Sequence, residues 1–148
     1  MEMIFVGTSV NNGHWQFDKQ MGSKEYVGFI YLIIDDYMDK FYLGKKLYRG
    51  TGMINSGKES NWKSYISSSK YLQTHINNRP KEEFSFLCLD EYRRKGTLAY
   101  AETWTLCYVE APTSDRWLNK RIEAISWKVS EPISQKHKDR LQAIICKS

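Results

Sequence analysis

The stretch Gly28–Gly44, GFIYLIIDDYMDKFYLG, decides the fold of this 148-residue chain. Val27 to Ile34 is rich in β-branched and aromatic residues, which favour the pleated, half-buried surface of a strand. A polar turn, Asp35 to Lys40, follows, and apolar residues resume at Phe41 to Leu43. The stretch therefore predicts a β-hairpin around which the rest of the chain is organised.

Two tyrosines of this hairpin lie on neighbouring predicted strands. Side chains alternate along a strand, so one face of the first strand carries Val27, Phe29, Tyr31 and Ile33. If the turn closes as predicted, Tyr42 on the second strand lies within cross-strand reach of Tyr31. Aromatic residues are common in strands and this chain has 10 tyrosines, so the pair alone does not indicate chemistry.

The segments after the hairpin predict two helices and a third strand. A helix capped by Ser67 to Ser69 is expected to end before Pro80. The alternating stretch from Glu83 to Leu89 predicts the third strand. Thr97 is then expected to cap a second helix, whose apolar spacing continues until Pro112.

We expect three parts along the chain, namely an extension at residues 1–25, a core domain at 26–122 and a tail at 123–148. Phe5, Trp15 and Phe17 of the extension are expected to cover core surface. The tail predicts an amphipathic helix that packs on the domain, with Pro132 in its first turn. The apolar stripe of this helix is Ile133, His137, Leu141 and Ile144.

Composition indicates a globular protein with an anionic partner. The chain has 22 Lys and Arg against 17 Asp and Glu, a net charge of +5 and a pI near 9.0. Three cysteines without CxxC spacing favour buried, reduced thiols, and no secretory signal is evident. The longest apolar stretch, Val27 to Ile34, is too short to cross a bilayer. We therefore expect a cytoplasmic protein with no membrane partner.

Glu102 is the most informative single residue of the chain. Its neighbours at helical spacing are Leu98, Ala99, Thr105 and Leu106, so the carboxylate projects from the stripe that packs on the sheet. Pairing with a nearby lysine would satisfy the carboxylate without any chemistry. A carboxylate held ionised in a cleft would instead favour a hard divalent cation such as Mg²⁺ or Mn²⁺, because such ions prefer oxygen ligands.

Cations and aromatic residues alternate between the hairpin and the first predicted helix. The segment from Lys45 to Asn61 is rich in Gly, Ser and Lys and predicts a mobile basic loop, and Trp62-Lys63-Ser64-Tyr65 follows it. Such a mixture suits nucleic acid, since cations neutralise phosphates and rings stack on bases, although a solvated loop beside one core tryptophan explains it equally well. The candidate nucleic-acid-binding residues are Lys45, Lys46, Arg49, Trp62 and Lys63.

Other catalytic classes are excluded by missing motifs. The sequence has no GxxxxGK[ST], GxSxG or HExxH motif, which argues against P-loop hydrolases, serine hydrolases and zincins. The three histidines show no metal-ligand spacing.

The order of these segments resembles the GIY-YIG nuclease superfamily. Gly28-Phe29-Ile30-Tyr31 and Tyr42-Leu43-Gly44 resemble the two halves of its signature, spelled here FIY and YLG. Ala99-Tyr100-Ala101-Glu102 and Leu118-Asn119 are similar to its later motifs. The resemblance covers roughly residues 26 to 122 and is closest to phage-encoded, stand-alone members akin to homing endonucleases. It implies an α+β fold, with a small three-stranded antiparallel sheet flanked by helices.

The resemblance also implies a divalent-metal-dependent endonuclease that hydrolyses DNA. We expect a monomer or a homodimer. By this resemblance Tyr31 would be the general base, or the hydrogen-bond partner, of the attacking water, and Tyr42 would position water or phosphate. Glu102 would hold the cation. Asn119 would orient the metal site, and Gly44 belongs to the second signature half.

The chain departs from the family at the usual arginine of the first helix, which has no clear counterpart. Lys63 is the expected substitute, with Tyr65 where relatives carry His or Tyr. Lys46 and Lys63 are the candidate cations that would activate Tyr31, since a tyrosine with an ordinary pKa near 10 is a poor base. A catalytically inactive nucleic-acid-binding module, or a protein that binds a host factor, remains an alternative on the same fold.

Overall fold

The computed structural model describes residues 10–51, 56–123, 129 and 131–146. It contains the strands β1 (Gly28–Asp35), β2 (Lys40–Leu47) and β3 (Phe84–Tyr92). The α-helices are α1 (Lys70–Asn78), α2 (Lys95–Tyr108) and α3 (Gln135–Ile145). Short 3₁₀ turns are η1 (Trp62–Ser64), η2 (Lys81–Glu83) and η3 (Ala111–Thr113). The α+β class is confirmed.

The sheet is antiparallel with the order β2-β1-β3, so the predicted three-stranded sheet is confirmed and β1 lies at its centre. Tyr31 pairs with Gly44, and Tyr42 pairs with Ile33. The two phenol rings are therefore diagonal neighbours on one face, with their centroids 6.4 Å apart. The register between β1 and β3 shifts at Ile30/Tyr31, directly at the first tyrosine.

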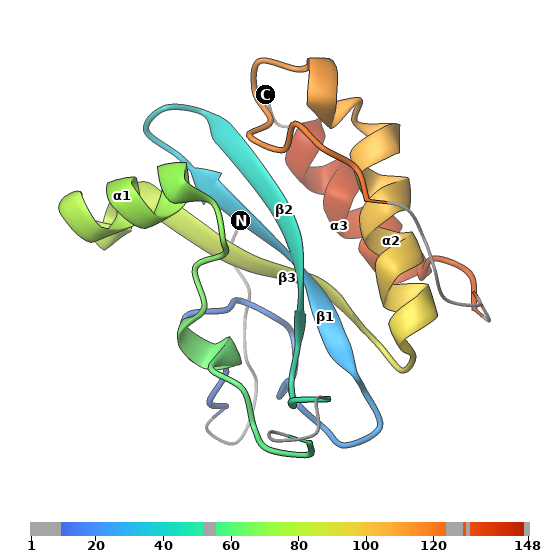
Figure 1. Cartoon of the computed structure of the whole chain (residues 1–148). Coiled ribbons are helices and arrows are strands. Elements are labelled where there is room, and N and C mark those ends of the chain that lie inside the picture. The colour runs from blue at the N-terminus through green and yellow to red at the C-terminus, as the bar shows by residue number, and fades with distance from the viewer. Residues whose placement is uncertain (1–9, 52–55, 124–128, 130, 147–148) are drawn as a thin grey trace.

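Different elements cover the two faces of the sheet (Figure 1). On the helical face, α2 and α3 pack against a mainly aliphatic core whose members include Ile30, Leu32, Leu98, Leu141 and Ile144. On the aromatic face, α1 and the N-terminal segment pack against a core whose members include Trp15, Phe29, Tyr31, Tyr48 and Trp62. Trp15 and Phe17 of the extension cover core surface as predicted, while Phe5 lies outside the described residues.

Three predictions about element ends need correction. Thr97 does not cap α2, because the chain turns into that helix directly after β3 and the cap position falls on Arg94. Pro132 does not lie in the first turn of α3, because the side chain of Ser134 caps this helix by accepting from the His137 amide. The predicted loop is also wrong at its start, since Lys45 and Lys46 belong to β2.

Other predictions about burial and boundaries have mixed outcomes. Ser69 caps α1 by accepting from the Leu72 amide, as the serine run indicated. Cys88 is buried, but Cys107 and Cys146 are exposed, contrary to the prediction of buried thiols, although all three are free. None of the helices in the described residues has the length and apolar character needed to span a membrane.

Candidate active site

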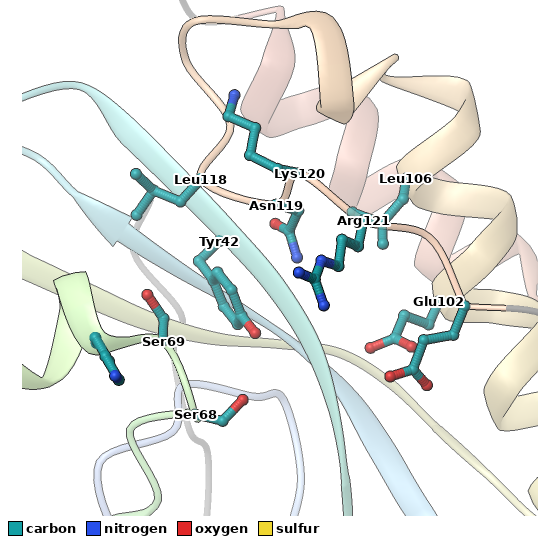
Figure 2. Close-up of a pocket in the computed structure, with 11 residues that line it drawn as sticks. Tyr42, Ser68, Ser69, Glu102, Leu106, Leu118, Asn119, Lys120 and Arg121 are labelled. Carbon is teal, nitrogen blue, oxygen red and sulfur yellow. The ribbon is translucent and has the colours of Figure 1, made fainter.

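A cavity of about 580 Å³ lies at the outer edge of β2 (Figure 2). Four separate segments line it: Tyr42 of β2, Ser68–Lys70 at the start of α1, Glu102 and Leu106 of α2, and residues 118–121 with Glu123. Because β2 is an edge strand, residues from both faces of the sheet can reach this cavity around its side. Sequence analysis had selected Tyr42, Glu102 and Asn119, and the fold brings all three together here.

Glu102 lies on α2 with only 16% of its side chain exposed. Burial raises the pKa of this carboxyl above its usual value, the nearby Glu123 adds to that effect, and the Lys45 ammonium opposes both. The Lys45 Nζ lies 3.2 Å from Glu102 Oε1 and 3.8 Å from Glu123 Oε2. Pairing with a lysine, the purely structural alternative for Glu102, is therefore present in this structure.

The two signature tyrosines occupy different depths. The Tyr42 side chain lines the cavity, and burial raises its pKa while a hydrogen bond with Ser68 lowers it. Tyr31 is only 2% exposed, and its hydroxyl lies directly over Gly44, where a Cβ would overlap it. Burial first, then the charges of Tyr42, Tyr65 and Glu102, raise the pKa of Tyr31 well above its usual value. At neutral pH both phenols therefore carry their protons.

Lys46 is the cation beside the phenol cluster. Its Nζ lies 4.1 Å from the centroid of the Tyr65 ring, and the Tyr65 ring meets Tyr31 edge-on with centroids 6.0 Å apart. Burial lowers the pKa of Lys46. Lys63 instead lies over the Trp62 ring at 5.5 Å and is not among the residues that line the cavity. Of the two predicted cations, the fold therefore brings Lys46 to the tyrosines.

Two predicted nucleic-acid contacts serve the fold. Trp62 is 2% exposed, and its indole N–H donates to Glu59, so the ring packs in the aromatic core and is not available for base stacking. Arg49 Nη2 donates to the Gly22 carbonyl at 2.7 Å and ties two loops together. Trp62 and Arg49 therefore both make contacts within the fold, and their contacts with nucleic acid stay predictions.

Asn119 clamps the segment after η3 to the outer edge of β2. Its Oδ1 accepts from the Leu43 amide at 2.9 Å, and its Nδ2 donates to the Leu43 carbonyl at 2.8 Å. The Leu118 amide donates to the Phe41 carbonyl, and the Phe41 amide donates to the Arg116 carbonyl, each at 2.7 Å. The segment thus forms an isolated parallel bridge, Trp117 with Phe41, along the outer edge of β2. Both the oxygen and the nitrogen of the Asn119 side-chain amide hold it there.

The model of the family described as "Putative endonuclease segE, GIY-YIG domain" matches residues 13–122 of the chain. The chain belongs to this GIY-YIG family. The comparisons with curated proteins and with solved structures found no match. Membership confirms the superfamily that the sequence resembles and supports a nuclease function in general terms.

Sequence analysis missed several residues of this GIY-YIG cavity. Lys70, Arg121 and Glu123 line it but lay outside the selected site. Lys70 directly follows the serine run that predicted a helix cap, and Arg121 lies two residues after Asn119, which the family resemblance had marked. Proximity to those motifs was the available signal. Proximity in sequence is weak evidence, because the sequence alone does not show that the two segments face each other.

The GIY-YIG site offers oxygen donors for a divalent cation. Glu102 supplies a carboxylate, Tyr42 a hydroxyl, and Glu123 a second carboxylate at the exposed rim. No cluster of three or more His, Cys, Asp or Glu side chains suited to a metal occurs among the described residues. A cation that keeps most of its water beside one carboxylate, as Mg²⁺ does, therefore fits this donor set. Such an ion would compete with Lys45 for Glu102.

Proposed function

We propose that this chain is a divalent-metal-dependent endonuclease of the phage-encoded type that hydrolyses phosphodiester bonds in DNA. One observation carries the proposal: Tyr42, Glu102 and Asn119, which are far apart in the sequence, line a single cavity at the edge of β2. A net charge of +5 supports an anionic polymer as substrate.

Hydrolysis of a phosphodiester needs an oriented water, neutralised phosphate oxygens and a stabilised leaving oxygen. Glu102 would hold the Mg²⁺ or Mn²⁺ ion, which supplies charge neutralisation at the phosphate when bound. The Tyr42 hydroxyl, held by Ser68, orients the water or a phosphate oxygen at the cavity wall. Tyr31 is not among the residues that line the cavity, and its hydroxyl lies buried over Gly44. This hydroxyl acts first as a hydrogen-bond donor, because its raised pKa keeps the proton on Oη.

Tyr31 can take the proton of the attacking water only as a phenolate, after its own proton has passed to solvent, and this requires a cation that favours the phenolate. Lys46 has this role in our proposal, because its ammonium lies against Tyr65, which contacts Tyr31 in turn. Lys45 has a different role: it balances the Glu102 carboxylate until a divalent cation takes its place. The two adjacent lysines therefore point to opposite faces of β2 and serve different groups.

Nicking of supercoiled plasmid tests the proposal. The chain is expected to convert supercoiled DNA to the open circular form with Mg²⁺ or Mn²⁺ and to stop when a chelator is added. Glu102→Gln keeps the side-chain shape but removes the charge, and we expect it to lower the cleavage rate by at least about 1,000-fold. DNA binding by this variant, measured by fluorescence anisotropy, should remain within about threefold of the unsubstituted chain.

Glu82→Gln is the matched control, because it removes the same charge from η2, outside the cavity. Its cleavage rate is expected to match that of the unsubstituted chain. Cleavage that survives Glu102→Gln would contradict the assignment of the cation to Glu102. DNA binding without cleavage by the unsubstituted chain under every metal condition would favour a binding module on the same fold.

A further inference from the structure

We propose that Arg121 binds the scissile phosphate in this cavity and supplies the guanidinium group that the first helix of this chain lacks. The assignment rests on the proposed nuclease function and names a further phosphate-binding residue for it. Arg121 lies on the segment that follows Asn119, far in sequence from the basic stretch between the hairpin and α1.

The orientation of Arg121 is the first observation. Figure 2 shows its guanidinium pointing into the cavity, between the Tyr42 hydroxyl and the Glu102 carboxylate. The neighbouring Lys120 extends away from Glu102, and its ammonium donates to the carbonyls of Ser114 and Trp117 at 2.8 and 2.7 Å. Two adjacent cations therefore differ sharply: one fastens the loop, and the other faces the cavity.

The lack of a partner for Arg121 is the second observation. Within the described ranges, the structure gives its guanidinium no hydrogen bond and no ion pair, although Glu102 and Glu123 line the same cavity. Glu102 instead pairs with Lys45. The planar donors of Arg121 are thus available to an incoming anion, and their fork geometry matches two oxygens of one phosphate.

The main chain before Arg121 explains how an exposed side chain is aimed. The double hydrogen bond between Asn119 and Leu43 anchors this segment to β2 two residues before Arg121. Asn119 is therefore a positioning residue for Arg121, and its amide groups are already used. On the opposite wall, the N-terminal end of α1 contributes Ser69 and Lys70, whose charge and helix dipole also favour a phosphate.

Cleavage kinetics with three variants test the assignment. Arg121→Ala is expected to lower kcat by about 100-fold, with KM for the DNA changed by less than about threefold, because the contact strengthens as charge develops on the phosphate. Arg121→Lys keeps the charge without the fork and should recover no more than about a tenth of the lost rate. Lys120→Ala removes the adjacent cation and should lower kcat by less than about fivefold.

Chemical rescue separates a phosphate contact from a structural effect. Added ethylguanidinium should raise the rate of Arg121→Ala by about tenfold or more and should not affect Lys120→Ala. The thermal midpoint of Arg121→Ala should equal that of the unsubstituted chain, because the side chain is exposed.

The outcomes are decisive in three ways. Cleavage by Arg121→Ala at nearly the full rate, or equal losses in Arg121→Ala and Lys120→Ala, would overturn the role of Arg121 while leaving the nuclease function standing. An absence of rescue combined with a lowered thermal midpoint would assign a structural role to Arg121 instead. No cleavage by the unsubstituted chain would overturn the nuclease function and this assignment together.

Discussion

The two faces of the sheet are built from different side chains. The helical face joins Ile30 and Leu32 to α2 and α3 in a mainly aliphatic core. The aromatic face joins Phe29 and Tyr31 to the N-terminal segment, with rings such as Trp15 that contact several neighbours. Aliphatic packing gives one face its stability, whereas phenols give the other face polar tips that can reach solvent at an edge.

The candidate site belongs to neither face alone. Glu102 arrives from the helical face and Tyr42 from the aromatic face, and they meet in the cavity at the edge of β2. Gly44 is the position that lets the Tyr31 hydroxyl cross toward this edge, because the strand has no side chain there. Substitutions on the two faces should therefore have separable effects on stability and on cleavage.

The largest expected effect is the pH dependence of stability contributed by His137 on the helical face. His137 is fully buried; its Nδ1 accepts from the Tyr92 hydroxyl, and its Nε2 donates to the Thr105 hydroxyl, which itself donates to the Ala101 carbonyl. Burial lowers the pKa of His137 from 6.5 to about 4. As the pH falls, this histidine therefore takes up its proton at a higher pH in the unfolded chain than in the folded chain.

The contribution of His137 to the free energy of unfolding is fully present above about pH 6.5 and decreases as the pH falls toward about 4. Over this pH range the free energy of unfolding should decrease by about 3 kcal/mol. Urea denaturation at about pH 7 and about pH 4 should show this slope, and His137→Gln should flatten it by that amount. Burial also lowers the pKa of His14 on the aromatic face from 6.5 to about 4, so His14→Gln should remove a further part of the pH dependence in the same direction. Parallel curves for His137→Gln and the unsubstituted chain would contradict the assignment.

The second prediction removes hydroxyl groups from the aromatic face. Tyr31→Phe and Tyr42→Phe should each lower the cleavage rate by about 100-fold, equivalent to about 2.7 kcal/mol in the activation barrier. Their free energies of unfolding should change by less than about 1 kcal/mol, because only an oxygen is lost. Plasmid nicking and urea denaturation measure the two effects.

The control for these hydroxyl deletions is Tyr92→Phe, which removes a hydroxyl from the helical face. It breaks the hydrogen bond to His137 and should cost about 1 kcal/mol of stability without changing cleavage. A reduced cleavage rate in Tyr92→Phe, or full activity in Tyr31→Phe and Tyr42→Phe, would break the proposed division between the faces.

The smallest of the three effects is steric. Gly44→Ala would introduce a Cβ that overlaps the Tyr31 ring and hydroxyl, and we expect a loss of about 2 kcal/mol in the free energy of unfolding. Gly57→Ala is the comparison, because its Cβ would meet open space and only its φ of +77° opposes the change. The free energy of unfolding of Gly57→Ala should be about 1 kcal/mol lower than that of the unsubstituted chain. Equal stability of Gly44→Ala and the unsubstituted chain would show that the two strands are not packed this closely.

Local patterns were enough to predict most of the fold. The period of two in β1 predicted that Tyr31 and Phe29 share a face, and the serine run predicted the cap of α1. The ends of α2 and α3 were mispredicted, because Thr97 and Pro132 look like start signals while the tight connection from β3 and the Ser134 side chain decide the true starts. Local chemistry predicts the presence of an element more reliably than its first residue.

The candidate site was predictable only in part. Glu102 was detectable because a carboxylate on an apolar stripe is costly, and Tyr42 and Asn119 came from the family resemblance. Lys63 was chosen for its place in a basic stretch, but its ammonium lies over the Trp62 ring and it is not among the residues that line the cavity. Arg121 was not selected, because its direction depends on the clamp between Asn119 and β2, a contact that spans 76 residues of sequence.

Paramagnetic broadening by Mn²⁺ tests the central claim most directly, namely that residues from both faces form one cation site at the edge of β2. Titration of Mn²⁺ into the ¹⁵N-labelled chain should broaden the amide signals of Tyr42, Glu102 and Asn119 first. The signals of Tyr37 and Met38, at the exposed tip of the hairpin, should remain sharp. Glu102→Gln should abolish the selective broadening. Broadening elsewhere in the molecule, or a pattern that is unchanged in Glu102→Gln, would contradict the account.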